Sequence, residues 1–256
     1  MSSTSGGRSA SKISRLERGL HDFKEKDVQL LLDVYGITEP SERERLLDMG
    51  RQANVRGWWE AFGDVSTKAL QTYVSLEDIA QRIRSYENEQ LLGLLQIPDY
   101  TRHLVSTNSP EKSKQEIDRI VELREMRQER FMHESSAQLI CVLDEATLVR
   151  GYGSKAIMRR QLEHLITLAD HERVSFSLIE LSRLNAPVQI GTTTIFDFED
   201  GQLPDVVYIE RPNAGQYLEE ADAVDEYVKR FDRLLIASVR STSCVRRLQH
   251  HRNKYQ

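Results

Sequence analysis

The chain has 256 residues, of which 35 are basic and 40 acidic, so its formal net charge is -5 at pH 7. This length allows one large domain or two modest ones, and the charge excludes a general attraction for DNA, so any DNA contact must come from a local patch. The two cysteines lack metal-ligand spacing, no apolar run approaches the roughly 18 residues of a membrane span, and the N-terminus does not read as a signal peptide, so we expect a cytoplasmic protein with no membrane partner.

The first predicted element resembles the recognition helix of a DNA-binding helix-turn-helix. The stretch SASKISRLERG, residues 9–19, places Ser9 as a helix cap and Ile13 and Leu16 at helical spacing. Small polar and basic side chains suit base edges and phosphates. The candidate DNA-binding residues are Ser9, Ser11, Lys12, Ser14, Arg15 and Arg18. Because residues 1–8 cannot form the preceding helix, we expect an incomplete helix-turn-helix.

Two more helices are predicted within residues 25–54, the first ending at Gly36 and the second capped by Thr38. The aromatic stretch GWWEAF, with Trp58 and Trp59, then reads as a connector. We therefore predict an N-terminal helical part over residues 1–56 and a larger domain over 57–256.

The larger domain begins with three predicted helices. Apolar spacing predicts a helix over 74–86, a turn and short helix around Gly93 and Pro98, and a long charged surface helix over 111–132. The apolar run at 135–144 predicts a strand, and 155–170 predicts a helix.

The remaining segments alternate between strands and a final helix. Strand-like runs occupy 174–181, 192–200, 205–210 and 216–220, and 222–241 carries the last strong helical pattern. The fold class predicted is α+β, with a small, mainly antiparallel sheet flanked by helices.

Catalytic and metal-binding motifs are missing from the sequence. No HExxH, CxxC or GxSxG pattern occurs, and the histidines have no partner at metal-ligand spacing. The sequence therefore assigns no catalytic residue, metal or cofactor, and it identifies no enzyme class.

Taken together, several segments resemble actinobacterial regulators that join an XRE-type helix-turn-helix to a C-terminal DUF5753 (antitoxin-like) domain. The matching pieces include SKISRLERG, LEDIAQRIRSYE, GLLQIPDY, VELREMRQERF, VLDEATLVRGYGS and DVVYIE. The resemblance implies a transcription regulator or antitoxin-like protein whose C-terminal domain senses a small molecule or binds a partner protein.

Within the matching segments, several side chains suit a semi-polar ligand cavity. They are Tyr86, Gln96, Tyr100, Arg124, Arg127, Gln128 and Tyr208. Arg124 and Arg127 are three residues apart on one helix face and could hold a carboxylate or phosphate. The alternative is that they form structural salt bridges with Glu87, Glu145 or Glu210.

Two functions remain open from the sequence. The first is the helix-turn-helix regulator. The second is a domain that has lost DNA binding and acts as a biosynthetic enzyme, for example a cyclase, on a bulky apolar substrate; the incomplete helix-turn-helix favours this alternative.

The incomplete helix-turn-helix gives a first prediction. We expect only weak DNA binding that collapses as salt rises, because scattered basic side chains give phosphate contacts without register. Fluorescence anisotropy with labelled duplexes would measure it, and sequence-selective nanomolar binding at physiological salt would contradict it.

Assembly gives a second prediction. Helix-turn-helix proteins usually read paired half-sites, so we expect a homodimer whose interface includes Trp58 and Trp59 or the charged helix. Replacing both tryptophans with Ala should weaken association or destabilise the fold. Replacing Arg124 and Arg127 should leave association unchanged and alter ligand or partner binding. Sedimentation measures the association, and a monomeric wild type would contradict it.

Overall fold

The computed structural model describes residues 24–53, 57–187, 190–199, 203–211 and 215–255. The chain divides into two compact units between Glu60 and Ala61, and the described part of each unit has its own buried cluster of apolar side chains. The boundary that the sequence predicts near residue 56 stays a prediction. The predicted first helix and its six candidate DNA-binding residues lie outside the described residues.

The N-terminal unit contains two described helices, α2 (Glu25–Val34) and α3 (Pro40–Ala53). Gly36 has a φ of 70°, a left-handed conformation that glycine adopts without steric cost, and it lets the chain turn between them. Val28, Leu32 and Leu47 form the buried cluster. The two helices predicted for residues 25–54 are thereby confirmed. The aromatic stretch begins a short 3-10 helix, η1 (Trp58–Phe62).

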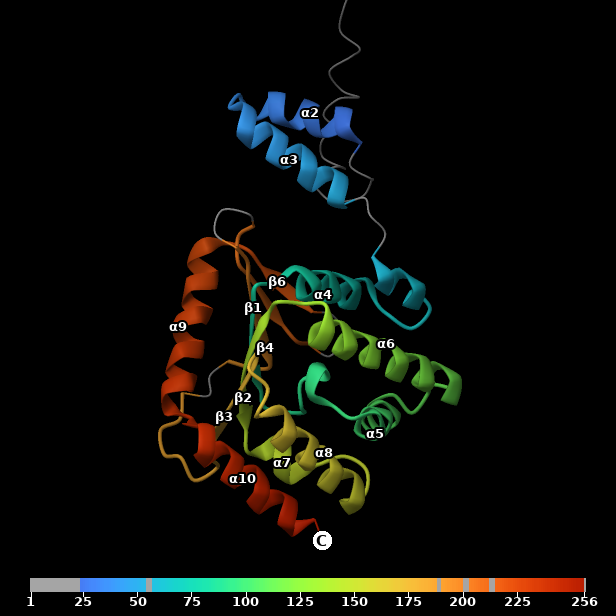
Figure 1. The fold of residues 1–256 in the computed structure, drawn as a ribbon, viewed down its shortest axis with the longest axis vertical. Helices are drawn as coiled ribbons and strands as arrows, with labels where there is room; N and C mark the ends of the chain where they lie inside the picture. Colours follow the sequence, from blue (N-terminus) through green and yellow to red (C-terminus); the bar gives the residue numbers. More distant parts are fainter. Residues whose placement is uncertain (1–23, 54–56, 188–189, 200–202, 212–214, 256) are drawn as a thin grey trace, which may run out of the picture. The chain divides into compact units, whose positions relative to one another are not determined.

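The larger unit is built on a seven-stranded sheet of order β6-β5-β4-β1-β2-β3-β7 (Figure 1). The strands are β1 (Arg82–Glu87), β2 (Gln138–Asp144), β3 (Val174–Ile179), β4 (Thr193–Asp197), β5 (Val206–Ile209), β6 (Gln216–Leu218) and β7 (Val239–Arg240). The β1–β2 and β2–β3 pairs are parallel, whereas the other pairs are antiparallel. The sheet is therefore mixed, with a parallel centre, and the predicted α+β class is confirmed.

Helices cover both faces of this sheet (Figure 1). One face packs against α4 (Lys68–Ile79), η2 (Gly93–Leu95), α5 (Pro98–Asn108), α6 (Lys114–His133), α7 (Ala146–Arg150), α8 (Lys155–Leu168) and α10 (Ser241–Lys254). The other face packs against α9 (Ala221–Ala237). In the described ranges, every helix is too short or too polar to span a membrane.

The helix predicted over residues 74–86 is wrong in its second half. Helix α4 ends at Ile79, Ala80 is extended, and Arg82–Glu87 form the central strand β1. The apolar spacing that suggested a helix ends in Ile83, which instead points into the core from the strand with no exposed surface. Pairing with both β2 and β4 satisfies the backbone of β1, and this tertiary context overrides the local pattern. The last predicted helix also ends early, at Ala237, and gives way to β7.

Candidate functional site

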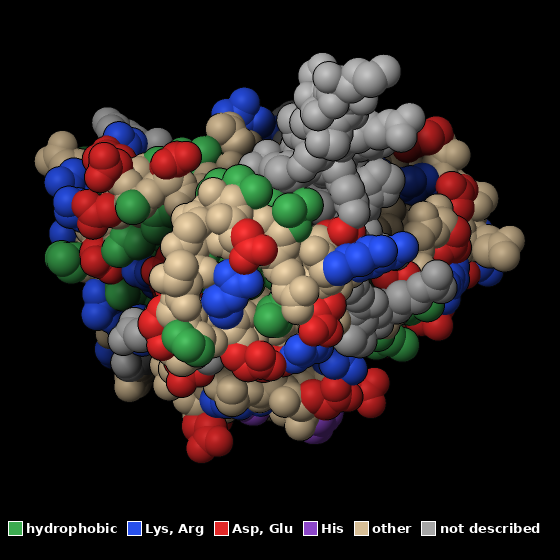
Figure 2. Space-filling model, turned by 90° about the horizontal axis from the view of Figure 1, so that it is seen from above, with side chains coloured by type: hydrophobic (Ala, Val, Ile, Leu, Met, Phe, Trp, Pro, Cys, Tyr) green, Lys and Arg blue, Asp and Glu red, His purple; other side chains and the backbone are tan. Residues whose placement is uncertain are grey.

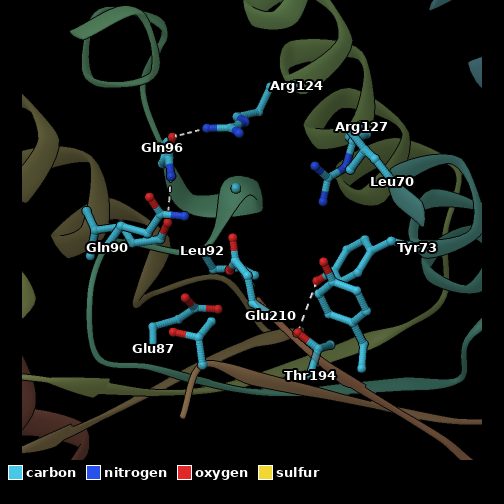
Figure 3. Close-up of a pocket in the computed structure, with 14 residues that line it drawn as sticks. Leu70, Tyr73, Glu87, Gln90, Leu92, Gln96, Arg124, Arg127, Thr194 and Glu210 are labelled. Carbon is cyan, nitrogen blue, oxygen red and sulfur yellow. Dashed lines mark hydrogen bonds between the residues drawn. The ribbon is translucent and has the colours of Figure 1, made fainter. Parts of the chain in front are cut away.

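A small cavity lies between the sheet and the helices α4 and α6, and it encloses about 100 Å³. Its walls combine charged groups with amide and aromatic ones (Figure 3). Residues of β1, β4 and β5 lie on one side, α6 contributes two arginines, α4 contributes Leu70 and Tyr73, and the loop 90–96 closes another side.

Strand alternation decides which sheet residues reach the cavity. Ser85 pairs with Thr194, and Thr194 pairs with Tyr208, so these three side chains form a row on the face under α4 and α6. Glu87 lies two residues after Ser85 and therefore on the same face. Tyr73 of α4 lies over the row, with its hydroxyl 3.2 Å from Thr194 Oγ1 and its ring 5.0 Å from that of Tyr208.

Helix α6 carries Arg124 and Arg127 on the same face, as their spacing predicts. The helix begins in a capping box formed by Ser113 and Glu116, which satisfies backbone donors of its first turn. Arg127 forms two parallel hydrogen bonds to Glu77, from Nε to Oε1 and from Nη2 to Oε2, each 2.8 Å. Both side chains are only 6% exposed. Burial opposes the charge of Arg127, but the Glu77 carboxylate outweighs burial and raises its pKa.

Arg124 is in a different position. Its Nη1 donates a hydrogen bond to Gln96 Oε1, and it forms no ion pair within the described part of the chain. Burial, and then the neighbouring cation of Arg127, lower the pKa of Arg124 to about 10. It therefore stays protonated at neutral pH. The cavity thus presents a cation whose described partner is a neutral amide (Figure 3).

Glutamine side chains hold the loop 90–96 in place. Gln161 of α8, which has no exposed surface, accepts a hydrogen bond from Ile97 N at 2.8 Å and donates to Leu95 O at 2.7 Å. Gln128 of α6 donates to the carbonyl oxygens of Gly93 and Gln96. Gly93 also permits close approach, because a Cβ there would lie 3.3 Å from Arg127 Nη1. The loop is consequently fixed against both helices that flank it.

Glu87 is a buried carboxyl group in the wall of the cavity. It is 3% exposed, and Ser85 Oγ donates a hydrogen bond to its Oε1 at 2.6 Å. Burial raises the pKa of Glu87 well above its usual range, by more than the hydrogen bond from Ser85 lowers it. The folded protein therefore favours the protonated acid at this position.

This arrangement gives a third prediction, on the variant Glu87→Gln. Between the unfolded-state pKa, about 4.3, and the raised folded-state pKa, unfolding releases a proton, so the stability of the wild type falls as pH rises. The stability of the Gln variant should not fall with pH in this way. At neutral pH the variant should be more stable than the wild type, by about 1.4 kcal/mol for each pH unit above the unfolded-state pKa and below the folded-state pKa of Glu87. Urea unfolding at a series of pH values measures it. The matched control is Glu129→Gln, at an exposed position, and equal pH profiles for Glu87→Gln and wild type would contradict the prediction.

The seven ligand-binding residues predicted from sequence fall into three groups. Gln96, Arg124, Arg127 and Tyr208 line the cavity. Gln128 and Tyr100 support its loop, since the Tyr100 hydroxyl accepts a hydrogen bond from Leu91 N. Tyr86 does not reach the cavity, because alternation along β1 turns it to the α9 face, where its hydroxyl lies 3.4 Å from Asp144 Oδ2.

The structure also corrects the salt bridges proposed for the arginine pair. Arg127 pairs with Glu77, which the sequence did not single out, while Glu145 pairs with His251 at 2.7 Å. Glu87 lines the cavity without an ion pair to either arginine. The sequence feature that could have predicted the burial of Glu77 is its position four residues after Tyr73, which places both side chains on the buried face of α4. In the described ranges, no group of three potential metal ligands occurs.

The comparison with known families covers most of the chain. The domain of unknown function DUF5753 matches residues 70–250, which include every residue named above as lining the cavity. No curated protein is significantly similar in sequence to the chain. Because the match spans more than half of its length, the chain belongs to the DUF5753 family.

Proposed function

We propose that the larger unit is a ligand-binding domain that recognises an acidic group of a small molecule. The single observation that carries the proposal is Arg124, a half-buried cation in the cavity wall. It donates a hydrogen bond to a neutral amide and forms no ion pair within the described residues, although the charge of Glu210 acts on it at longer range. Charge-assisted hydrogen bonds from a guanidinium to a carboxylate or phosphate are strong in such surroundings. Arg127 contributes positive charge, but its own hydrogen bonds go to Glu77.

We further propose that this domain regulates DNA binding by the N-terminal part. The support is the resemblance of residues 9–19 to a recognition helix and the two described helices that follow. A homodimer, with DNA and a small-molecule effector as partners, belongs to the same proposal. On the face shown in Figure 2, acidic and basic side chains are interspersed. The proposed DNA contact rests on residues 8–18, where four basic residues cluster in the sequence.

A calorimetric titration tests the binding proposal. Butanoate and inorganic phosphate serve as probes, and Arg124→Gln should lose the heat of binding that the wild type shows. The matched control is Arg233→Gln, which removes the same charge from an exposed position on α9, the helix on the other face of the sheet. The proposal fails if neither probe binds the wild type. It also fails if Arg124→Gln binds the probes as well as the wild type and the control variant Arg233→Gln do.

A second candidate function is general acid catalysis by Glu87. The observation that favours it is the buried carboxyl group with a raised pKa at the cavity wall. A cavity of about 100 Å³ holds a small group and not the whole of the bulky apolar substrate that the sequence left open, and that substrate stays a prediction. Mass spectrometry of a bound ligand after incubation separates the two functions. Binding returns the ligand unchanged, whereas catalysis returns a product with the wild type but not with Glu87→Gln.

A further inference from the structure

A second, larger cavity adjoins the first. We call the first the inner cavity and the second the outer cavity. The outer cavity encloses about 720 Å³ and shares four lining residues with the inner one, namely Gln90, Arg124, Thr192 and Glu210. Arg124 is therefore accessible from both spaces. Leu104, Val105, Ile120 and Tyr152 give the outer cavity an apolar portion.

The outer cavity has an excess of basic side chains. Lys112, Arg150 and Arg211 line it in addition to Arg124, against the acidic Glu89 and Glu210. Within the described residues, no ion pair involves Lys112, Arg150 or Arg211. Ion pairs are common elsewhere on the helices of this unit. These three charges therefore line the cavity without a directly paired carboxylate in the described residues, although Lys112 also acts at longer range on Glu116.

Size separates the roles of the two spaces. Sites for small molecules commonly measure about 300–1,000 Å³. The inner cavity is well below this range and suits a single acidic group, whereas the outer cavity lies within it. We infer that the ligand is an elongated molecule with acidic groups at both ends. One end binds Arg124, the middle crosses the apolar portion, and the other end lies against Lys112, Arg150 and Arg211. This inference rests on the proposed role of Arg124.

Dicarboxylates of increasing length test the inference. In calorimetric titrations, the aliphatic series from succinate to dodecanedioate is compared with monocarboxylates of the same length. At the matching length the second carboxylate should tighten binding about five-fold, which corresponds to about 1 kcal/mol for an ion pair at an accessible site. The triple variant Lys112→Gln/Arg150→Gln/Arg211→Gln should lose this gain and bind dicarboxylates as weakly as monocarboxylates. The control variant is Arg233→Gln. Every variant must also keep the melting temperature of the wild type.

The outcomes distinguish this inference from the function on which it rests. If monocarboxylates bind in an Arg124-dependent manner and no dicarboxylate binds more tightly, the two-ended ligand is wrong and the Arg124 site stands. If a gain occurs but survives in the triple variant, the outer basic residues are not its cause and the inference is again wrong. If no carboxylate of either series binds, the two-ended ligand is wrong, and if inorganic phosphate does not bind either, the Arg124 site fails with it.

Discussion

Replacing Arg127 with Ala is expected to lower the free energy of unfolding by about 3–5 kcal/mol. The reason is that the variant leaves Glu77, which is 6% exposed, as an uncompensated charge next to the core. The guanidinium also lies over the ring of Tyr73, 5.3 Å from its centroid, so the variant loses this contact too. Urea unfolding at neutral pH measures the loss.

A double variant provides the control for this prediction. Arg127→Met combined with Glu77→Leu removes both charges at similar volume and should recover most of the stability, because the cost arises from the unpaired charge. A loss below about 1 kcal/mol in Arg127→Ala would mean that the pair is not structural. In that case Arg127 would regain the ligand-binding role that its sequence position suggested.

Replacing Gln161 with Leu should lower the free energy of unfolding by about 2–6 kcal/mol. The substitution keeps the volume but leaves Ile97 N and Leu95 O, which the amide now satisfies, without their partner, at about 1–3 kcal/mol for each buried polar group. It should also weaken anion binding, because the released loop carries Gln96, the partner of Arg124. Thermal unfolding and the phosphate titration measure the two effects.

The matched control is Gln115→Leu, at an exposed position in the first turn of α6. It makes the same chemical change and should alter the unfolding free energy by less than about 0.5 kcal/mol. If Gln161→Leu also changes the unfolding free energy by less than about 0.5 kcal/mol, the loop keeps its shape without the amide, and Gln161 does not hold the cavity wall.

Much of the fold could be predicted from the sequence because apolar periodicity is a local property. The run LICVLD predicted β2, and the spacing of Ile117 and Val121 predicted α6, whose face then carries Arg124 and Arg127 together. The seven candidate ligand-binding residues were selected instead by the family resemblance and by side-chain type, and four of them line the cavity.

What the sequence could not predict depends on contacts between distant segments. The pattern of β1 includes two arginines, and Arg84 is tolerated at an inner strand because it pairs with Asp197, more than one hundred residues away. Without that pairing the segment reads as helix, and the orientation of Tyr86 cannot be deduced. The Arg127–Glu77 pair likewise joins two residues that lie fifty positions apart in the sequence, on α6 and α4. Sequence spacing therefore predicts the shared face of the arginines, but not which of them pairs with a carboxylate inside the fold.

The most direct test of the central claim, that Arg124 binds an acidic ligand while Arg127 supports the fold, is a titration followed by NMR. In a ¹⁵N–¹H spectrum, the Nε–H signals of the two arginines can be assigned by their disappearance in Arg124→Gln and in the double variant Arg127→Met/Glu77→Leu. Added phosphate should shift the Arg124 signal in a saturable manner and leave the Arg127 signal nearly unchanged, because Arg127 Nε already donates to Glu77. A saturable shift of the Arg127 signal with no change at Arg124 would contradict the account.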